Sequence, residues 1–290
     1  MGDTPPVNER PVVYQGEPGA FSEEAVIGFF GPALERTAVP TWRSVFEAVA
    51  DGSAPAGVIA IESSQAGTIR ETYDLLLEFH PRGVRIVGEV SVPVRLALMA
   101  LPGQSLDWID RVYSHGQALV QADAFLRSRP WEVMTTYNTA GAARGIAERH
   151  ERRAAAVASP RVAALYGLEV LADGIQSGDE NRTRFAVLAL DGLPPPRPAA
   201  PSVGRRTTLV FAVRNVPGSL YRCLGAFASR GVNLSSLESR PTKKARWEYV
   251  FWVDVDAAAD DPACAAALED LRAETEMVTV LGSYPRAAEA

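Results

Sequence analysis

The chain has 290 residues, of which 47% are hydrophobic and 22% are charged, and its formal net charge is −6 at pH 7. This length suits about two domains with a buried core. The acidic balance argues against a nucleic-acid partner, which needs a basic face, although a local arginine could still hold a small anion. Two cysteines and three histidines without ligand spacing exclude a disulfide framework and predict no metal site.

Cys223 and Cys264 are expected to be buried thiols of a reducing compartment. No apolar run reaches the roughly 20 residues that a membrane helix needs. Residues 1–10 are polar and contain prolines, unlike a secretory signal. We therefore expect a cytoplasmic protein with no membrane partner.

Strands alternate with helices through the first part of the chain. The caps expected for three of the helices are Ser22, Ser44 (with Glu47 completing a capping box) and Ser159, which precedes a proline. The alternation predicts an α/β domain with a mostly parallel sheet, which binds ligands where strands end and helices begin. The expected strands are 12–14, near Val39, 57–61, 84–90, 94–100, 111–113, 132–134, 154–158 and 185–190; the expected helices begin near 21 and 160 or span 44–49, 68–78, 117–127 and 138–149.

A proline-rich stretch then separates two expected domains, 11–191 and 205–285, with 192–204 as the linker. The second domain has the order βαββαβ, which is the ferredoxin-like arrangement, and is expected to be self-contained. Phe251, Trp252 and Val253 are expected to expose apolar surface for pairing between chains. The elements expected there are strands at 207–213, 237–241, 247–255 and 278–281 and helices at 218–230 and 263–274.

Polar clusters lie at the ends of several of the predicted strands, at 62–64, 114–117, 138–140 and 181–185. Their hydroxyls, amides and helix N-terminal N–H groups suit carboxylates, although each cluster alone could be a plain helix cap. His80 and His150 are expected to be solvated helix-end residues, whereas a role for His115 stays open. A nucleophile elbow, a dinucleotide-binding glycine motif and a phosphate loop are all absent from the sequence, so no nucleotide cofactor is expected.

These segments resemble the prephenate dehydratase family, and the resemblance covers about residues 12–285. The small domain is similar to an ACT domain. The motifs that carry the resemblance, in the family's order, are VYQGEPGAFS (13–22), IESSQAG (61–67), SHGQAL (114–119), NTAGAA (138–143) and NRTRF (181–185), followed by PGSL (217–220), GVNL (231–234) and ESRP (238–241).

The resemblance implies that prephenate loses water and carbon dioxide to give phenylpyruvate, on the route to phenylalanine, without a cofactor. It implies a two-lobed catalytic domain, like that of a periplasmic binding protein, with the site in the cleft. Because few residues precede the first motif, a fused chorismate mutase is not expected.

By the family's motifs, Thr183 donates a hydrogen bond to the leaving hydroxyl, Glu62 orients a loop, and Ser114 and Gln121 contact substrate. The same resemblance implies that Arg184 holds a carboxylate or fixes Thr183. The other residues expected to bind substrate are Ser63, Ser64, Asn138, Thr139 and Phe185.

The sequence departs from the family's pattern at two of these positions. Ser63 stands where the family usually has Asn, and Gly116 stands where it usually has Pro. Serine offers one hydroxyl in place of an amide, so substrate choice could differ. Arogenate dehydration, a non-aromatising decarboxylation and a catalytically inactive binding protein remain alternatives, although the Thr-Arg-Phe run argues against the decarboxylase.

For the small domain, the resemblance implies that phenylalanine binds as an allosteric effector between two ACT domains of a homodimer or homotetramer. Gly218 permits close approach of the backbone, and the helix that follows offers N–H groups to the amino-acid carboxylate. The residues expected at this site are Pro217, Gly218, Ser219, Leu220, Asn233, Leu234, Glu238 and Ser239.

Overall fold

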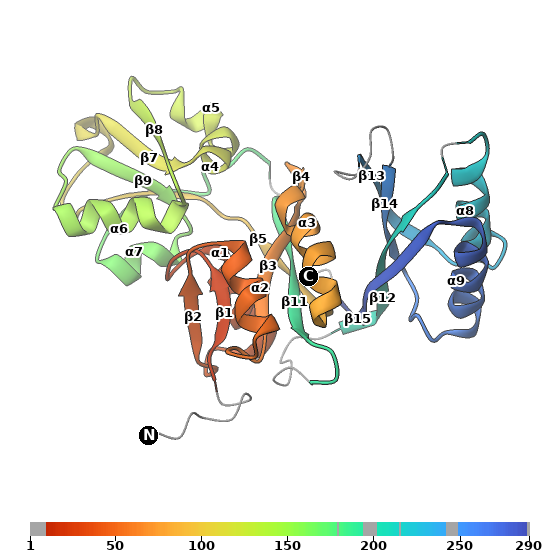
Figure 1. Ribbon diagram of the computed structural model, residues 1–290. Helices are drawn as coiled ribbons and strands as arrows, with labels where there is room; N and C mark the ends of the chain where they lie inside the picture. The colour runs from red at the N-terminus through yellow and green to blue at the C-terminus, as the bar shows by residue number, and fades with distance from the viewer. Residues whose placement is uncertain (1–9, 179, 194–201, 215, 242–248, 289–290) are drawn as a thin grey trace, which may run out of the picture.

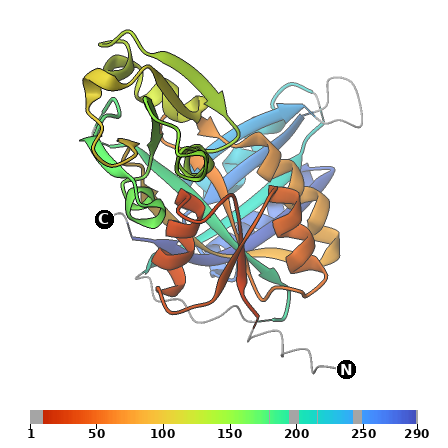
Figure 2. The same ribbon diagram turned by 90° about the vertical axis from the view of Figure 1, so that its left-hand side faces the viewer.

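The computed structural model describes residues 10–288, except 179, 194–201, 215 and 242–248. Three sheets organise the chain: two belong to the lobes of the N-terminal part and the third to a C-terminal domain (Figure 1). The second lobe stacks over the first, and the C-terminal domain lies against the first lobe, behind it in Figure 2. No helix within these described ranges is long and apolar enough to cross a membrane.

The first lobe is built on a mixed sheet with the strand order β2-β1-β3-β11-β5. Strands β1, β2 and β3 are parallel, whereas β11 is antiparallel to both of its neighbours. The elements of this lobe are β1 (Val12–Gln15), α1 (Phe21–Phe30), β2 (Arg36–Val39), α2 (Trp42–Ala50), β3 (Gly57–Ser63), β4 (Gly67–Thr68), α3 (Arg70–Phe79), the 3₁₀ turn η2 (His80–Arg82), β5 (Val84–Pro93) and β11 (Arg182–Leu190).

The second lobe has the strand order β10-β6-β9-β7-β8, with β7 parallel to β8 and β9. The helix expected at 117–127 is interrupted at Ala122. The elements of this lobe are β6 (Ala97–Ala100), the 3₁₀ turn η3 (Leu106–Trp108), β7 (Arg111–His115), α4 (Gly116–Gln121), α5 (Asp123–Leu126), β8 (Glu132–Thr136), α6 (Thr139–Arg149), β9 (Ala154–Ala158), α7 (Arg161–Tyr166) and β10 (Glu169–Asp173).

Two crossover segments, 94–96 and 174–181, join the lobes, and the Val94 N–H donates to the Asn181 carbonyl at 2.7 Å. The two-lobed arrangement is therefore confirmed. The expected common strand direction holds for β1, β2, β3 and β5, whereas β11 runs the other way between β3 and β5. The chain leaves the first lobe after β5 and returns as β11, so the returning strand enters that sheet antiparallel to its neighbours.

The predicted helix caps differ from the observed ones. Helix α1 starts at Phe21 without a side-chain cap, so Ser22 lies inside it. Helix α2 starts earlier than expected, and the cap is Thr41, whose Oγ1 accepts from the Ser44 N–H at 3.1 Å. The Ser159 hydroxyl donates to a carboxylate of α1 instead of capping α7. For α2 and α7, another polar group competes for the role: Thr41 replaces Ser44 as the cap, and a carboxylate takes the Ser159 hydroxyl.

The C-terminal domain forms an antiparallel sheet of order β13-β14-β12-β15, with α8 and α9 on its outer face (Figure 1). The βαββαβ order is confirmed. Strand β12 starts at Ser202, inside the expected linker, and residues 194–201 of that linker lie outside the described residues. The elements are β12 (Ser202–Ala212), α8 (Ser219–Ala228), β13 (Leu234–Pro241), β14 (Tyr249–Val255), α9 (Pro262–Glu274) and β15 (Met277–Ala287).

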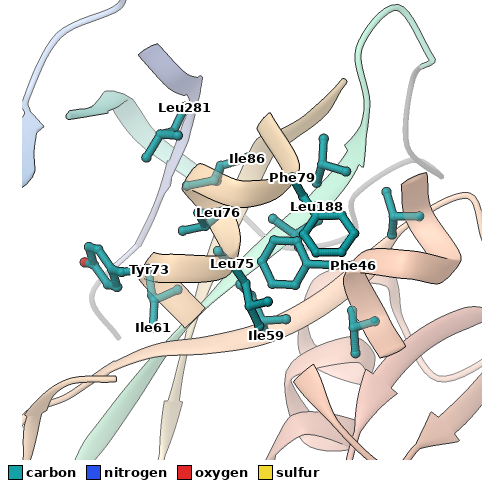
Figure 3. Close-up of a cluster of buried hydrophobic side chains, with 14 of the residues drawn as sticks. Phe46, Ile59, Ile61, Tyr73, Leu75, Leu76, Phe79, Ile86, Leu188 and Leu281 are labelled. Atoms are coloured by element: carbon teal, nitrogen blue, oxygen red, sulfur yellow. The ribbon is translucent and has the colours of Figure 1, made fainter. Parts of the chain in front are cut away.

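One hydrophobic cluster continues from the first lobe into the C-terminal domain, as Leu281 beside Ile86 shows (Figure 3). The Trp252 ring packs edge-to-face on Tyr73 with 4.7 Å between centroids. Trp252 is only 3% exposed, so the expected apolar surface between chains is absent at this residue. Side chains alternate along β14: Val253 packs toward α8 and α9, while Trp252 faces the lobe. The domain is therefore not self-contained.

The two domains approach at backbone distance where β15 crosses β5. A Cβ atom at Gly282 would overlap the carbonyl oxygen of Ile86. We expect Gly282→Ala to push the strands apart and lower the free energy of unfolding by about 1–3 kcal/mol, as overpacking does. Urea denaturation followed by fluorescence measures this.

The matched control is Gly225→Ala in α8, where an added Cβ meets nothing within 4 Å. That substitution should raise the free energy of unfolding by about 0.5–1 kcal/mol through helix propensity. Equal effects of the two substitutions would contradict the close packing of β15 on β5.

Candidate active site

A cavity of about 460 Å³ lies between the two lobes, where strands of both sheets end and helices begin. From the first lobe it is lined by the turn after β1, the start of α2 and the end of β3. From the second lobe it is lined by the starts of α4 and α6. Its polar lining comprises Gln15, Ser22, Thr41, Ser63, Glu71, His115, Gln117, Gln121, Tyr137, Asn138, Thr139 and Thr183.

Positive potential at this cavity comes from helix ends and not from basic side chains. Helices α1, α2 and α6 begin at the cavity, and first-turn N–H groups of a helix have no intrahelical acceptor. Among the described lining residues none is Arg or Lys, and the sole carboxylate is that of the exposed Glu71. The cavity therefore suits a small anion bound by backbone N–H groups and hydroxyls.

Strand β11 contributes to this cavity on one face only. Thr183 and Phe185 line the cavity, and Thr183 lies opposite Ser63 of β3 in the sheet. Because successive side chains of a strand point to opposite faces, the intervening Arg184 points toward the C-terminal domain. Its guanidinium lies 2.7 Å from Asp254, 2.9 Å from Glu62 and 3.2 Å from Glu89.

Arg184 and Glu62 are therefore absent from the cavity lining, and of the two roles predicted for Arg184 this position favours fixing Thr183 over holding a substrate carboxylate. The two residues are opposite one another in the β3–β11 register and form a pair on the far face of the sheet. Burial opposes the charge of Arg184, but the carboxylates around it, led by Asp254, outweigh burial and raise the pKa of the guanidinium. Arg184 is thus held as a cation between the domains.

Ser114 and Ser64 are also absent from the cavity lining. Ser114 is fully buried, and its hydroxyl donates to the Val157 carbonyl at 2.6 Å, which ties β7 to β9. The Ser64 hydroxyl accepts from the Arg182 N–H at 3.0 Å and joins the end of β3 to the start of β11. Both serines act on the scaffold of the site.

The remaining predicted residues come together in the cavity: Ser63, Gln121, Asn138, Thr139, Thr183 and Phe185. The Ser63 hydroxyl accepts from the N–H groups of Gln65 and Ala66, each at 3.3 Å, and from the Gln117 side chain at 3.5 Å. Gln121 accepts from the Asn181 amide at 3.0 Å at the crossover between lobes. Asn138 caps α6 by accepting from the Gly141 N–H.

His115, whose role the sequence left open, lines the cavity with its Nδ1 accepting from the Gln117 N–H at 3.3 Å. Other lining residues were not identified from the sequence, among them Gln15, Trp42 and Tyr137. Each lies where a strand meets a helix, so the strand-end rule was the signal that could have found them.

The residues expected at the effector site lie on separate parts of the C-terminal domain. Gly218, with φ +84°, precedes α8, whereas Asn233 and Leu234 follow its other end, about 15 Å away by helix length. Glu238 and Ser239 lie on β13, which is an edge strand of the sheet.

Comparison with known proteins identifies the family. The sequence model of prephenate dehydratase matches residues 12–192, and the ACT domain model matches residues 207–273. The chain belongs to the prephenate dehydratase family. The C-terminal domain is its ACT domain, and cavity-lining segments lie within the matched catalytic region.

Curated relatives include proteins named prephenate dehydratase and proteins named arogenate dehydratase. The bifunctional chorismate mutase/prephenate dehydratase of Aquifex aeolicus is 36% identical over 95% of this chain and 74% of its own length. Arogenate dehydratase 1 of Petunia hybrida is 39% identical over 94% of this chain and 66% of its own length.

Several solved structures match nearly the whole chain, among them the following two. Prephenate dehydratase from Arthrobacter aurescens in complex with L-Phe has a TM-score of 0.82 and 32% identity, covering 96% of this chain and 90% of its own. GqqA, described as a novel type of quorum quenching acylase, has a TM-score of 0.83 and 34% identity, covering 96% and 98%.

The turn that carries Gly16 and Ala20 into the cavity is held by Glu23 of α1. This carboxylate accepts from the Gly19 N–H at 2.7 Å and from Arg36 at 2.7 Å, and lies 3.2 Å from Arg161 of the second lobe. Burial opposes its charge, but these donors outweigh burial and lower the pKa of Glu23. The neighbouring Glu24 differs, because burial raises its pKa despite the Ser159 hydroxyl.

We expect opposite pH effects from the two acids. Glu23 is more acidic when folded, so its charge stabilises the fold above the ordinary pKa of 4.5, and that stability is lost as the pH falls. Glu23→Gln should lower the free energy of unfolding at pH 7 by about 1–3 kcal/mol and flatten its acid dependence.

Glu24→Gln serves as the matched control. The pKa of Glu24 is raised in the folded state, so the free energy of unfolding falls as the pH rises above the ordinary pKa of a glutamate. The substitution Glu24→Gln should remove that fall. Denaturant unfolding between pH 4 and pH 7 compares the two, and a shared direction of change would contradict the assigned contacts.

Proposed function

We propose that this chain catalyses the decarboxylative dehydration of prephenate to phenylpyruvate, with phenylalanine as an allosteric effector. The observation that carries the proposal is that the cavity contains the hydroxyl of Thr183. Among the described residues of the cavity, only helix N-termini supply positive potential. Membership of the prephenate dehydratase family supports the proposal.

Prephenate is a dianion, and the cavity offers binding groups for its carboxylates. Helices α1 and α6, one from each lobe, both begin at the cavity. The hydroxyls of Ser22 and Thr139 stand beside them. When helix N-termini bind the substrate, no fixed cation neutralises the charge of its ring carboxylate. The ring carboxylate can therefore depart as neutral carbon dioxide.

The reaction breaks two bonds of the ring. The bond to the ring carboxylate breaks to release carbon dioxide, and its electron pair moves into the ring. The carbon–oxygen bond at the opposite ring carbon breaks in turn, and hydroxide leaves with a proton as water. Hydroxide is a poor leaving group, so a donor to that oxygen lowers the barrier. We assign this role to Thr183, which donates a hydrogen bond or relays a proton.

We expect the wild-type chain to form phenylpyruvate from prephenate above the spontaneous rate, followed by phenylpyruvate absorbance. Thr183→Ala should lower kcat by about 10²–10³-fold while substrate still binds, because one donor to the developing charge is lost. Thr183→Ser keeps the hydroxyl and should retain most of the rate. Full activity of Thr183→Ala would remove Thr183 from the mechanism, and an inactive wild type would favour the binding-protein alternative.

Arogenate is the second candidate substrate, and a specific feature favours it. Arogenate carries an ammonium group where prephenate has a ketone, and the exposed carboxylate of Glu71 lines the cavity. The plant relatives named arogenate dehydratase agree with this possibility. Ser63 remains the position where the chain departs from the family's usual Asn.

We expect Glu71→Gln to lower kcat/KM for arogenate relative to prephenate by about two- to fivefold, as the loss of an exposed charge pair does. Steady-state assays with both substrates measure the ratio. Glu78→Gln, near the other end of α3, is the control and should leave the ratio unchanged. If Glu71→Gln left the ratio of kcat/KM for the two substrates unchanged, Glu71 would not interact with the ammonium group of arogenate.

An acylase activity like that in GqqA's description has no support in the cavity. Nucleophilic acyl transfer needs a hydroxyl hydrogen-bonded to a general base. Among the cavity-lining residues that the structure describes, no serine or threonine hydroxyl is hydrogen-bonded to a histidine or carboxylate.

For regulation, we propose that phenylalanine binds between ACT domains of two chains in a homodimer or homotetramer. The separation of Gly218 from Asn233 within one chain supports a site completed by a second chain. A relative solved with L-Phe supports the choice of effector.

Two buried, free cysteines agree with a cytoplasmic location.

A further inference from the structure

A second cavity, of about 240 Å³, lies between the first lobe and the ACT domain and is lined mainly by charged side chains. Arg184 and Arg206 enter it with Glu62, Glu89 and Asp254. We propose that Asp254 is a positioning residue for the dehydration, acting through Arg184 on Thr183. The ACT domain is then a structural part of the active site. This inference rests on the proposed function.

Arg184 is clamped from three separate segments of the chain. Glu62 belongs to β3, Glu89 to β5 and Asp254 to β14 of the ACT domain. Glu89 and Asp254 are each 3% exposed, so solvent screens their pairs with Arg184 only weakly. Asp254 is itself fixed, since its Oδ1 accepts from the Thr208 hydroxyl at 2.6 Å.

These contacts of Arg184 lie where the hydrogen-bonded pairing of β3 and β11 is irregular. Thr183 lies opposite Ser63 and Arg184 opposite Glu62, but Phe185 lies opposite Ala60, so the register between β3 and β11 shifts directly after Arg184. The extra residue is Ile61, so the bulge bends β3, whereas β11 keeps a regular register with β5 from Thr183 to Phe185. The pair of Arg184 with Glu62 joins β11 to this bend directly beside Thr183, and so helps to fix the position of Thr183.

The same cluster reaches a predicted effector residue. The Asn233 amide donates to Asp256 at 2.8 Å, and Asp256 lies 3.7 Å from Arg206. Arg206 in turn pairs with Glu89 at 2.8 Å, and Glu89 with Arg184. One hydrogen bond and three ion pairs thus lead from Asn233, just before the edge strand β13, to Arg184 beside Thr183, which is a physical route for coupling.

Asp254→Asn tests the proposal in the full-length chain. We expect kcat for prephenate to fall about tenfold, with KM changed less than about twofold, because Thr183 acts on the leaving group in the transition state. A fall in stability alone would reduce the amount of folded enzyme but would not change kcat per folded active site. Circular dichroism and thermal unfolding measure the folded fraction.

Asp74→Asn is the matched control. Asp74 pairs with Arg240 of the ACT domain at 3.1 Å, so the substitution breaks an ion pair at the same interface without touching β11. We expect kcat and KM of this variant to match the wild type. Equal losses of kcat in Asp74→Asn and Asp254→Asn would overturn the proposal, since any weakening of the interface would then suffice.

A double-mutant cycle gives the decisive comparison. In an Arg184→Lys background, which keeps the charge but loses the planar fork, Asp254→Asn should add little to the loss of kcat. A full tenfold loss in that background would overturn the route through Arg184. If the Asp254→Asn variant does not fold, the Arg184→Lys variant tests the proposal alone. A kcat of Arg184→Lys equal to that of the wild type would contradict the proposal. Wild-type turnover in the same assays tests the proposed function separately.

Discussion

The alternation of side chains along β11 is the constraint on which the site and the domain interface both depend. Thr183 and Phe185 point into the cavity between the lobes, and Arg184 points to the ACT domain. A change of register by one residue would exchange these faces and place a guanidinium in the cavity. The strand thus gives adjacent residues different surroundings, the cavity on one face and the ACT domain on the other.

The cavity between the lobes and the interface with the ACT domain differ in the source of their positive charge. At the cavity, helix N-termini supply positive potential, and the structure describes no Arg or Lys in the lining. At the interface, Arg184 and Arg206 are buried with carboxylates from both domains. A buried ion pair is weak evidence for stability, because apolar residues of similar size often serve as well. The hydrophobic contact of Trp252 with Tyr73 is better suited to hold the domains together, and the ion pairs to fix their geometry.

Much of the architecture could be predicted from the sequence, because buried strands and polar turns alternate with helices. The same rule located Ser63, Asn138, Thr139 and Thr183 at strand ends, and these residues meet in the cavity. The direction of a side chain depends on register and on what covers each face, and neither is visible in one sequence. For that reason Ser114 was expected to contact substrate, and a substrate carboxylate was one of two expected partners of Arg184, although both side chains bind groups of the scaffold. The burial of Trp252 was missed because it depends on contacts distant in the chain.

The most direct test of the two-faced strand is a crystal structure of the full chain with a non-reactive prephenate analogue. We expect the analogue between the lobes, with its ring oxygen within hydrogen-bond distance of the Thr183 hydroxyl and its carboxylates at the helix N-termini. Arg184 should remain on Glu62, Glu89 and Asp254. An analogue carboxylate bound by the Arg184 guanidinium, or a ligand outside this cavity, would contradict the assignment of the two faces.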